Sequence, residues 1–228
     1  MSPRILDLFS CAGGAGEGYR RAGFEVVGVD IDPQPHYPFE FHQADAIEFA
    51  LKHGHEFDAI HASPPCQLYS VARSMTKNSK RVHPDLVAPT REALRMVGKP
   101  YIIENVVGAP MEDPVTLCGS MFGLTAPDVD GVPLKLLRHR LFESNIDLEA
   151  PAHTSHRELE GLTASVFGSG GTYKPEYRDR RLRGGGYVPH ISVIRELMGI
   201  DWMTRYELSQ SIPPAYTEYL GAQLLRVI

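Results

Sequence analysis

Short runs of apolar residues recur along the chain, and polar residues, glycine or proline bound each of them. Four runs have the length and apolarity of buried parallel strands: 4–9 (RILDLF), 25–29 (EVVGV), 58–62 (DAIHA) and 100–107 (PYIIENVV). Helical patterns lie between and after them, at 19–22, 47–53, 86–97, 191–198 and 215–227. Strands that alternate with helices in this way are typical of an α/β fold with a parallel sheet.

The run 58–62 stops at two prolines. Pro64 and Pro65 must end this strand, because proline lacks the amide donor that a central strand needs. Cys66 follows directly and therefore lies past the carboxyl end of a strand, where open α/β sheets gather ligands and catalytic groups. A lone cysteine is often a buried structural thiol. Here the rigid proline pair and the polar Gln67 favour an accessible nucleophile.

A glycine-rich stretch, 10–18 (SCAGGAGEG), joins the first strand to the first helix. The second strand then ends at Asp30, about 20 residues beyond the turn, where nucleotide-binding folds place an acid on the ribose hydroxyls. Turns of this kind serve dinucleotides, flavins and S-adenosylmethionine. The spacing CAGGAG is not the GxGxxG of dehydrogenases, and it favours the methyltransferase kind.

Three further polar positions carry candidate chemistry. Asp45 follows a third short strand and could bond an adenine amine or cap the next helix. Glu104, beside Asn105, interrupts the apolar run 100–107, so its carboxyl group either has a partner or works as an acid. Arg138 and Arg140 stand two residues apart in the segment 137–143, which as a strand would point both side chains the same way.

Composition is that of one well-buried globular domain: 228 residues, of which 43% are hydrophobic and 22% charged. No apolar run is long enough to cross a bilayer, and the first residues lack signal-peptide architecture, so we expect a cytoplasmic protein without a membrane partner. Cys11, Cys66 and Cys118 are odd in number and have no Cys/His metal spacing. The sequence therefore predicts neither a disulfide framework nor a metal site.

Net charge is −5, yet two segments are locally basic. The loop 68–84 contains Arg73, Lys77, Lys80 and Arg81 and no acid, which suits a lid that holds phosphates. The segment 174–183 has five cations against two acids and precedes three glycines. It could contact a nucleic acid, and it could equally be a solvated surface loop.

Taken together, the motifs resemble the DNA (cytosine-5) methyltransferase family, in that family's order and over nearly the whole chain. They are DLFSCAGGAGEGY at the first turn, VDID, SPPCQLYS, IIENV, RHRLF and SIPPAYTEYLG. The resemblance implies a Rossmann-like class I S-adenosylmethionine-dependent methyltransferase fold with a reduced variable region. It also implies three parts: a catalytic and cofactor-binding domain (1–143), a short target-recognition region (144–190) and a C-terminal segment that returns to the catalytic domain (191–228).

The resemblance also assigns roles. Cys66 matches the nucleophile that adds to cytosine, because carbon 5 alone is too weak a nucleophile to take a methyl group. Glu104 matches the acid at ring nitrogen 3, Arg138 and Arg140 match the pair that orients the base, and Asn105 is expected to tie neighbouring loops. S-adenosyl-L-methionine would be bound by residues of the first turns and the late motif: Phe9, Ala12, Gly13, Gly14, Asp30, Ile31, Asp45, Ala46, Pro65 and Ser211.

The implied substrate is double-stranded DNA with the target base flipped out of the helix. Expected contacts to DNA are Gln67, Ser70, Arg73, Lys77, Arg178 and Arg181. Cys11 stands where the family usually has glycine, and Ser209-Gln210 where it generally has Gly-Asn. The gap between the arginine motif and the late motif is short, so a monomer with brief or relaxed sequence readout, or with a specificity partner, is expected. The modification could serve restriction, self-protection or regulation.

Three rival functions stay open to different degrees. Amino-methyltransferases place an aromatic residue after the proline pair, where this chain has Cys66. An RNA cytosine-5 methyltransferase would share the catalytic residues and differ in the variable region. A non-catalytic DNA-binding homologue would usually lack the nucleophile or the acid, and Cys66 and Glu104 are both present.

Overall fold

A seven-stranded sheet forms the centre of the computed structural model, which describes residues 2–66, 69, 85–153, 155–166 and 187–228. The strands stand in the order β3 (Glu40–Gln43), β2 (Glu25–Asp30), β1 (Arg4–Leu8), β4 (Ala59–Ala62), β5 (Tyr101–Val106), β9 (Arg140–Ser144) and β6 (Val115–Leu117). The first five are parallel, and β9 runs antiparallel to both β5 and β6. The α/β class expected from the sequence is confirmed.

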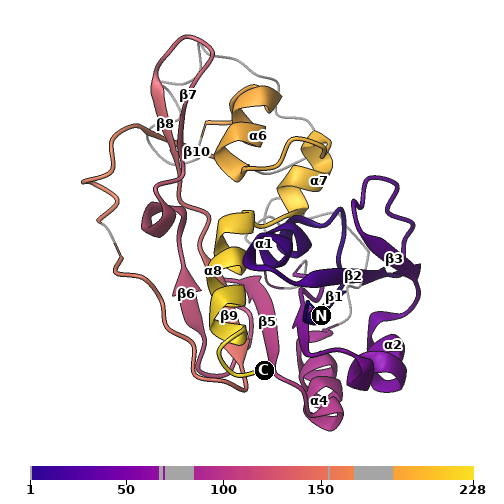
Figure 1. Ribbon diagram of the computed structural model, residues 1–228. Coiled ribbons are helices and arrows are strands. Elements are labelled where there is room, and N and C mark those ends of the chain that lie inside the picture. The colour runs from indigo at the N-terminus through magenta and orange to yellow at the C-terminus, as the bar shows by residue number, and fades with distance from the viewer. Residues whose placement is uncertain (1, 67–68, 70–84, 154, 167–186) are drawn as a thin grey trace.

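Helices cover both faces of this sheet, which explains why its strands are nearly continuous apolar runs. On one face, α1 (Gly14–Ala22) and α8 (Pro214–Leu224) lie side by side (Figure 1) and form a core with Ile5, Ile102 and Phe142. On the other face, α2 (Ala46–His53), the short 3-10 helix η1 (Gly54–Glu56) and α4 (Val87–Val97) cover the opposite side chains of the same strands. No helix among the described residues is both long and apolar enough to cross a membrane.

The strand order reverses between β1 and β4. Strands added from β1 run outward through β2 to β3, whereas β4 and β5 lie on the other side of β1. Leu8 pairs with Ala62 in register, so the loops that follow β1 and β4 leave the same edge of the sheet side by side. Such a reversal opens a crevice at the carboxyl ends of the strands, where open α/β sheets bind their ligands.

A smaller unit stands beyond this edge. It is a three-stranded sheet of β7 (Thr125–Pro127), β8 (Pro133–Leu136) and β10 (Leu162–Ala164), preceded by the 3-10 helix η2 (Gly119–Phe122). Two helices from later in the chain, α6 (Ile191–Met198) and α7 (Arg205–Gln210), close its core (Figure 1). The unit thus draws on chain from both sides of the boundaries expected at residues 143 and 190.

One expectation about the strands is wrong. The strand β9 begins at Arg140, and Arg138 precedes it with a φ of 37° in the left-handed region. Arg138 and Arg140 therefore do not share one face of a strand. The side chain of Arg138 bonds backbone carbonyl groups, whereas that of Arg140 pairs with Glu104.

A buried ion pair joins α4 to the antiparallel strand β9. Arg91 donates from Nε and Nη2 to the two carboxylate oxygens of Glu143, at 2.5 and 2.7 Å. The backbone amide of Glu112 donates to the same carboxylate at 2.8 Å, and Arg91 also reaches the carbonyl of Pro110. Arg91 is 7% exposed and Glu143 is 2% exposed. The charges are thus compensated by a bidentate contact that water hardly reaches.

We expect Glu143→Gln to lower the free energy of unfolding by about 3–5 kcal/mol, because it leaves the Arg91 charge buried without its partner. Glu25→Gln removes an exposed partner of Arg4 and is the matched control, with an expected change below about 1 kcal/mol. Denaturant unfolding followed by circular dichroism measures both variants. Equal stability of the two variants would contradict a structural role for the pair.

Candidate active site

The turn after β1 has a tightly constrained backbone. Phe9, Cys11 and Gly13 all have positive φ, at 55°, 44° and 86°, and the helix α1 begins at Gly14. A Cβ atom on Gly14 would lie 1.6 Å from Oγ of Ser211, so only glycine permits the late segment to approach here. Gly13, Gly14 and Ser211, three of the expected cofactor residues, are therefore brought together in space.

Asp30 ends β2 beside this turn. Its Oδ2 accepts a hydrogen bond from the amide of Cys11 at 2.9 Å, and its Oδ1 accepts one from the amide of Asp32 at 3.0 Å. The next side chain, Ile31, is 67% exposed. An aliphatic side chain this open, beside a carboxylate at the carboxyl end of a strand, gives the face of a nucleoside base something to pack against.

Asp45 caps α2. Its Oδ1 accepts hydrogen bonds from the amides of Ile47 and Glu48, both at 2.9 Å. Of the two roles open to this residue, the structure shows capping, and a bond to adenine remains a prediction. Ala46 begins the helix and is buried, while Ala12 packs into the core of the smaller unit and its carbonyl accepts from Trp202 Nε1 at 3.0 Å. Ala12 could thus reach a cofactor only through its backbone.

Two buried polar groups beneath the turn escaped the sequence analysis. Asp7 is fully buried in β1, and this burial raises the pKa of its carboxyl group to about 8 against a hydrogen bond from Tyr37 Oη. Ser10 is 6% exposed, and its Oγ has no hydrogen-bond partner among the described residues. An acid within the apolar run 4–9 was the available signal for Asp7. An unpaired buried hydroxyl beside the turn is what a site awaiting a polar ligand would show.

Cys66 lies half-buried past the end of β4, beside Pro65, as the two prolines predicted. Asn105 donates from Nδ2 to the carbonyl of Pro64 at 2.9 Å, so β5 holds the proline turn in place, as expected for Asn105. Burial raises the pKa of the Cys66 thiol, with a further contribution from the Glu104 charge, whereas Arg140 and Arg138 lower it. The pKa of the Cys66 thiol therefore depends on the charges of Glu104, Arg138 and Arg140.

Glu104 lies in β5, next to β4, and is 7% exposed. Its Oε1 lies 3.0 Å from Nε of Arg140, and Ser63 forms a hydrogen bond with its side chain. Burial nevertheless raises the pKa of the Glu104 carboxyl group, because desolvation outweighs both arginines and the serine. Oε1 accepts no hydrogen bond of good geometry from the described residues, so it can still take a partner.

Arg138 is committed to the protein backbone. It donates from Nη1 to the carbonyl of Val166 at 2.8 Å, and from Nη2 to the carbonyls of Ser209 at 2.8 Å and of Ser211. Burial and the neighbouring Arg140 lower its pKa to about 9. These bonds tie the segment before β9 to the smaller unit and to the late motif. Of the two arginines, only Arg140 pairs directly with Glu104.

A chain of buried hydrogen bonds leads to Glu104 from Tyr19 in α1 through His61 in β4. Tyr19 Oη lies 3.0 Å from His61 Nδ1, and His61 Nε2 lies 2.9 Å from Ser63 Oγ, which bonds Glu104. Burial lowers the pKa of His61 to about 3, so the imidazole is neutral at physiological pH. Neither His61 nor Ser63 was singled out from the sequence. The available signal was a polar histidine within the apolar strand run DAIHA.

All six residues expected to contact DNA lie outside the described residues: Gln67, Ser70, Arg73, Lys77, Arg178 and Arg181. The basic loop 68–84, apart from residue 69, and the basic segment 174–183 lie outside them as well. These roles stay predictions.

One group of metal-binding side chain types lies beside the site. Cys118, His139, His153 and His156 offer ligand atoms that all lie within 4.8 Å of one another. The sequence expectation of no metal site considered spacing along the chain, and these residues are spread over 39 positions. The tertiary structure gives reason to reconsider that expectation.

Comparison with known proteins gives a consistent result. Residues 3–110 match the family model of C-5 cytosine-specific DNA methylases, whereas a search of curated proteins found no match. A protein from E. coli described as a DNA modification methyltransferase encoded within a prophage is 16% identical, with a TM-score of 0.61 over 99% of both chains. The Dnmt2 methyltransferase of S. pombe is 14% identical, with a TM-score of 0.60 over 99% of both chains.

A third solved structure, the methyltransferase EhMeth of Entamoeba histolytica, is 12% identical, with a TM-score of 0.52 over 100% of this chain and 99% of the other. At these identities the structural likeness shows a common fold, and that fold is the methyltransferase fold expected from the motifs. The match to the family model and the order of the motifs agree: residues 3–110, just under half of the chain, form a domain that matches the C-5 cytosine-specific DNA methylases.

Proposed function

We propose that the chain transfers a methyl group from S-adenosyl-L-methionine to carbon 5 of cytosine in double-stranded DNA, through a covalent adduct on Cys66. The observation that carries this proposal is the placement of Cys66 and Glu104 at the carboxyl ends of adjacent strands. There the Glu104 carboxyl has a raised pKa and pairs with Arg140. A nucleophile beside a buried acid is the pair that attack on a cytosine ring requires.

In this mechanism the Cys66 thiolate forms a bond to carbon 6 of a flipped-out cytosine. Glu104 donates a proton or hydrogen bond to ring nitrogen 3, so the electron pair displaced from the 5,6 double bond is stabilised on the ring. When bound, S-adenosyl-L-methionine supplies an electrophilic methyl group, which carbon 5 takes. The carbon 5 proton then passes to water, the electrons of its bond re-form the 5,6 double bond as the thiolate leaves carbon 6, and ring nitrogen 3 returns its proton to Glu104. Arg140 holds the Glu104 carboxyl in place throughout.

The residues around the first turn fit this cofactor. Positive φ at Phe9 and Gly13 bends the turn after β1, Asp30 offers carboxylate oxygens for ribose hydroxyls, and the exposed Ile31 offers an apolar face. The unpaired Ser10 Oγ adds a buried hydroxyl at the same turn. Pro65, Ala46 and Ser211 lie in the turn, helix start and late motif that border this region.

DNA is the substrate we propose because the matching family model is one of DNA methylases. An RNA substrate would use the same Cys66 and Glu104, so a direct comparison of substrates decides between them. We further propose that the short region 144–190 contributes target recognition, and that the enzyme acts as a monomer, with or without a specificity partner.

We expect Cys66→Ala to abolish methyl transfer while binding of S-adenosylhomocysteine stays near normal, because the thiolate takes part only in attack on the base. Tritium transfer to duplex DNA and to tRNA, with calorimetric titration of the variant, measures both halves. Met96→Ala changes an exposed sulfur-containing side chain on α4, away from the proposed attack, and is the control. Duplex DNA with 5-fluorocytosine should trap the wild type covalently and should not trap Cys66→Ala, because no proton can leave carbon 5.

Wild-type transfer rates in Cys66→Ala would refute the mechanism, and preferential labelling of tRNA would refute the DNA substrate.

We expect Asp30→Ala to weaken binding of S-adenosylhomocysteine about 10- to 100-fold, the loss of charge-assisted hydrogen bonds worth about 1.5–3 kcal/mol. Asp32→Ala changes the exposed neighbouring acid and should leave affinity within about threefold. Isothermal titration calorimetry measures both, and thermal melting confirms that the variants fold. Tight binding of NADH by the wild type in place of S-adenosylhomocysteine would contradict the assignment.

A pH profile tests the roles of Cys66 and Glu104 together. Reaction needs the Cys66 thiolate and the protonated Glu104, and burial raises both pKa values, from ordinary values of 9.0 and 4.5. Single-turnover rates of the wild type should rise with pH up to the Glu104 pKa and fall above the Cys66 pKa. Between the two pKa values the rate should stay level, because the thiolate fraction of Cys66 rises by the same factor as the protonated fraction of Glu104 falls.

Glu104→Gln should lose this level region. A neutral amide does not titrate, so its rate should climb up to the Cys66 pKa, from a value roughly 100-fold below the wild type. Glu112→Gln, an exposed acid, should keep the wild-type profile. A level region that survives in Glu104→Gln would show that another group supplies the proton.

A further inference from the structure

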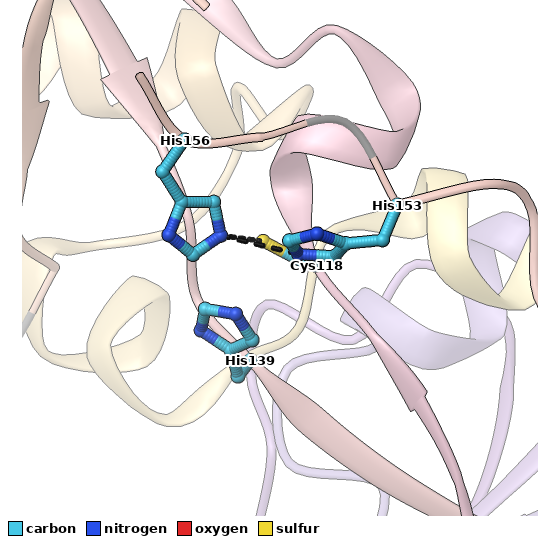
Figure 2. Close-up of side chains that lie close together, drawn as sticks. All are labelled: Cys118, His139, His153 and His156. Carbon is cyan, nitrogen blue, oxygen red and sulfur yellow. Dashed lines mark hydrogen bonds between the residues drawn. The ribbon is translucent and has the colours of Figure 1, made fainter. Parts of the chain in front are cut away.

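We propose that Cys118, His139, His153 and His156 bind one Zn²⁺ ion. This ion holds residues 138–140, which include both arginines of the site, in place. Figure 2 shows the four side chains pointing toward a common centre. Sγ of Cys118 lies 3.4 Å from Nε2 of His156, and this nitrogen lies 3.2 Å from Nε2 of His153. Tetrahedral zinc with ordinary bond lengths keeps its sulfur and nitrogen ligands about 3.3–3.6 Å apart. The two measured pairs lie within about 0.1 Å of this range.

Hydrogen bonds among the four side chains cannot satisfy all of their nitrogen and sulfur atoms at once. His156 Nε2 faces both a second imidazole nitrogen and a sulfur, so one N–H proton can serve only one of these contacts at a time. The ring of His139 lies 5.0 Å from that of His156 and 6.1 Å from that of His153, between centroids. Several lone pairs therefore converge on one small volume, which a cation at the centre would satisfy together.

The backbone around these residues is fixed independently of any ion. Cys118 is buried between β6 and η2, and the amide of Gly119 donates to the carbonyl of Leu137 at 2.6 Å. A Cβ atom on Gly119 would lie 2.0 Å from the carbonyl oxygen of Leu136, so glycine is what brings Cys118 beside His139. Lys135 Nζ donates to the carbonyls of His156 and Leu159, both at 2.6 Å, which anchors the segment that supplies the other two histidines.

The kind and number of donors favour zinc. One thiolate and three imidazoles suit a borderline-soft cation, and magnesium or calcium would require oxygen ligands. Ser120 Oγ donates to Cys118 Sγ at 3.2 Å, an outer contact that supports a thiolate. Four protein ligands complete a tetrahedron, which is the pattern of structural zinc sites, whereas catalytic sites keep one position open.

His139 connects the proposed ion to the active site. His139 stands between Arg138 and Arg140, and its carbonyl accepts a hydrogen bond from Arg140 Nη1 at 2.8 Å. Arg140 in turn pairs with Glu104. The ion would join the start of β9 to β6 and to the segment carrying His153 and His156, so it would position Arg140 without touching a substrate.

Metal analysis of untagged protein, grown with supplementary zinc, tests the site. We expect about one equivalent of zinc per chain by mass spectrometry, and on exchange with Co²⁺ the visible absorption of a tetrahedral cobalt–thiolate centre. Cys118→Ser should abolish the thiolate-to-cobalt band, and His153→Gln should lower the zinc content at least tenfold after dialysis against a weak chelator. His55→Gln, an exposed histidine elsewhere, is the matched control and should retain the ion.

A second measurement does not depend on how the variants fold. Removal of a tightly bound ion from the wild type with a strong chelator should lower the melting temperature by roughly 5–15 °C, and zinc should restore it. His153→Gln changes an exposed side chain and should melt like the chelated wild type. Wild-type protein without bound zinc and without a cobalt spectrum would overturn the proposal, as would full zinc retention in both ligand variants.

Discussion

The buried carboxyl group of Glu104 is the constraint on which the arrangement of the site depends. A carboxyl group so nearly excluded from water must have partners, and they come from separate parts of the chain: Ser63 after β4 and Arg140 at the start of β9. His61 in β4 and Tyr19 in α1 extend the contact from the sheet to the helix that covers it. The partners are incomplete, because burial still raises the pKa of Glu104. A carboxyl group with a raised pKa keeps its proton to a higher pH than an ordinary glutamate and is therefore better suited to donate it.

Close approaches at glycine join the late part of the chain to the first turn. Gly14 leaves room for Ser211, and a Cβ on Gly18 would lie 2.0 Å from Thr217 Oγ1 and 2.1 Å from the carbonyl of Pro214. Thr217 donates to the carbonyl of Ala15 at 2.8 Å. The helix α8 thus fixes α1, which follows the turn proposed to hold the cofactor. Glycines in this stretch provide backbone bending at Gly13, close approach of the segment before α8 at Gly14 and contact between α1 and α8 at Gly18.

Arg138 shows how one positive-φ residue can connect the two units of the fold. Its guanidinium bonds the carbonyls of Val166, in the smaller unit, and of Ser209 and Ser211, before α8. His139 beside it belongs to the proposed zinc site, and Arg140 beyond it pairs with Glu104. Three consecutive side chains therefore point to three different partners, which a regular strand with two-residue alternation would not allow.

The sequence by itself determined the α/β class, the strand that ends before Pro64, the position of Cys66 past that strand and the acid in β5, because prolines and apolar runs act locally. Only the tertiary structure decided that Arg138 serves the backbone, since its φ and its partners 28 to 73 residues away leave no local pattern. The same holds for the chain Tyr19–His61–Ser63–Glu104 and for Cys118 with its three histidines. Contacts between distant residues are set by the packing of elements, and spacing along the chain does not record them.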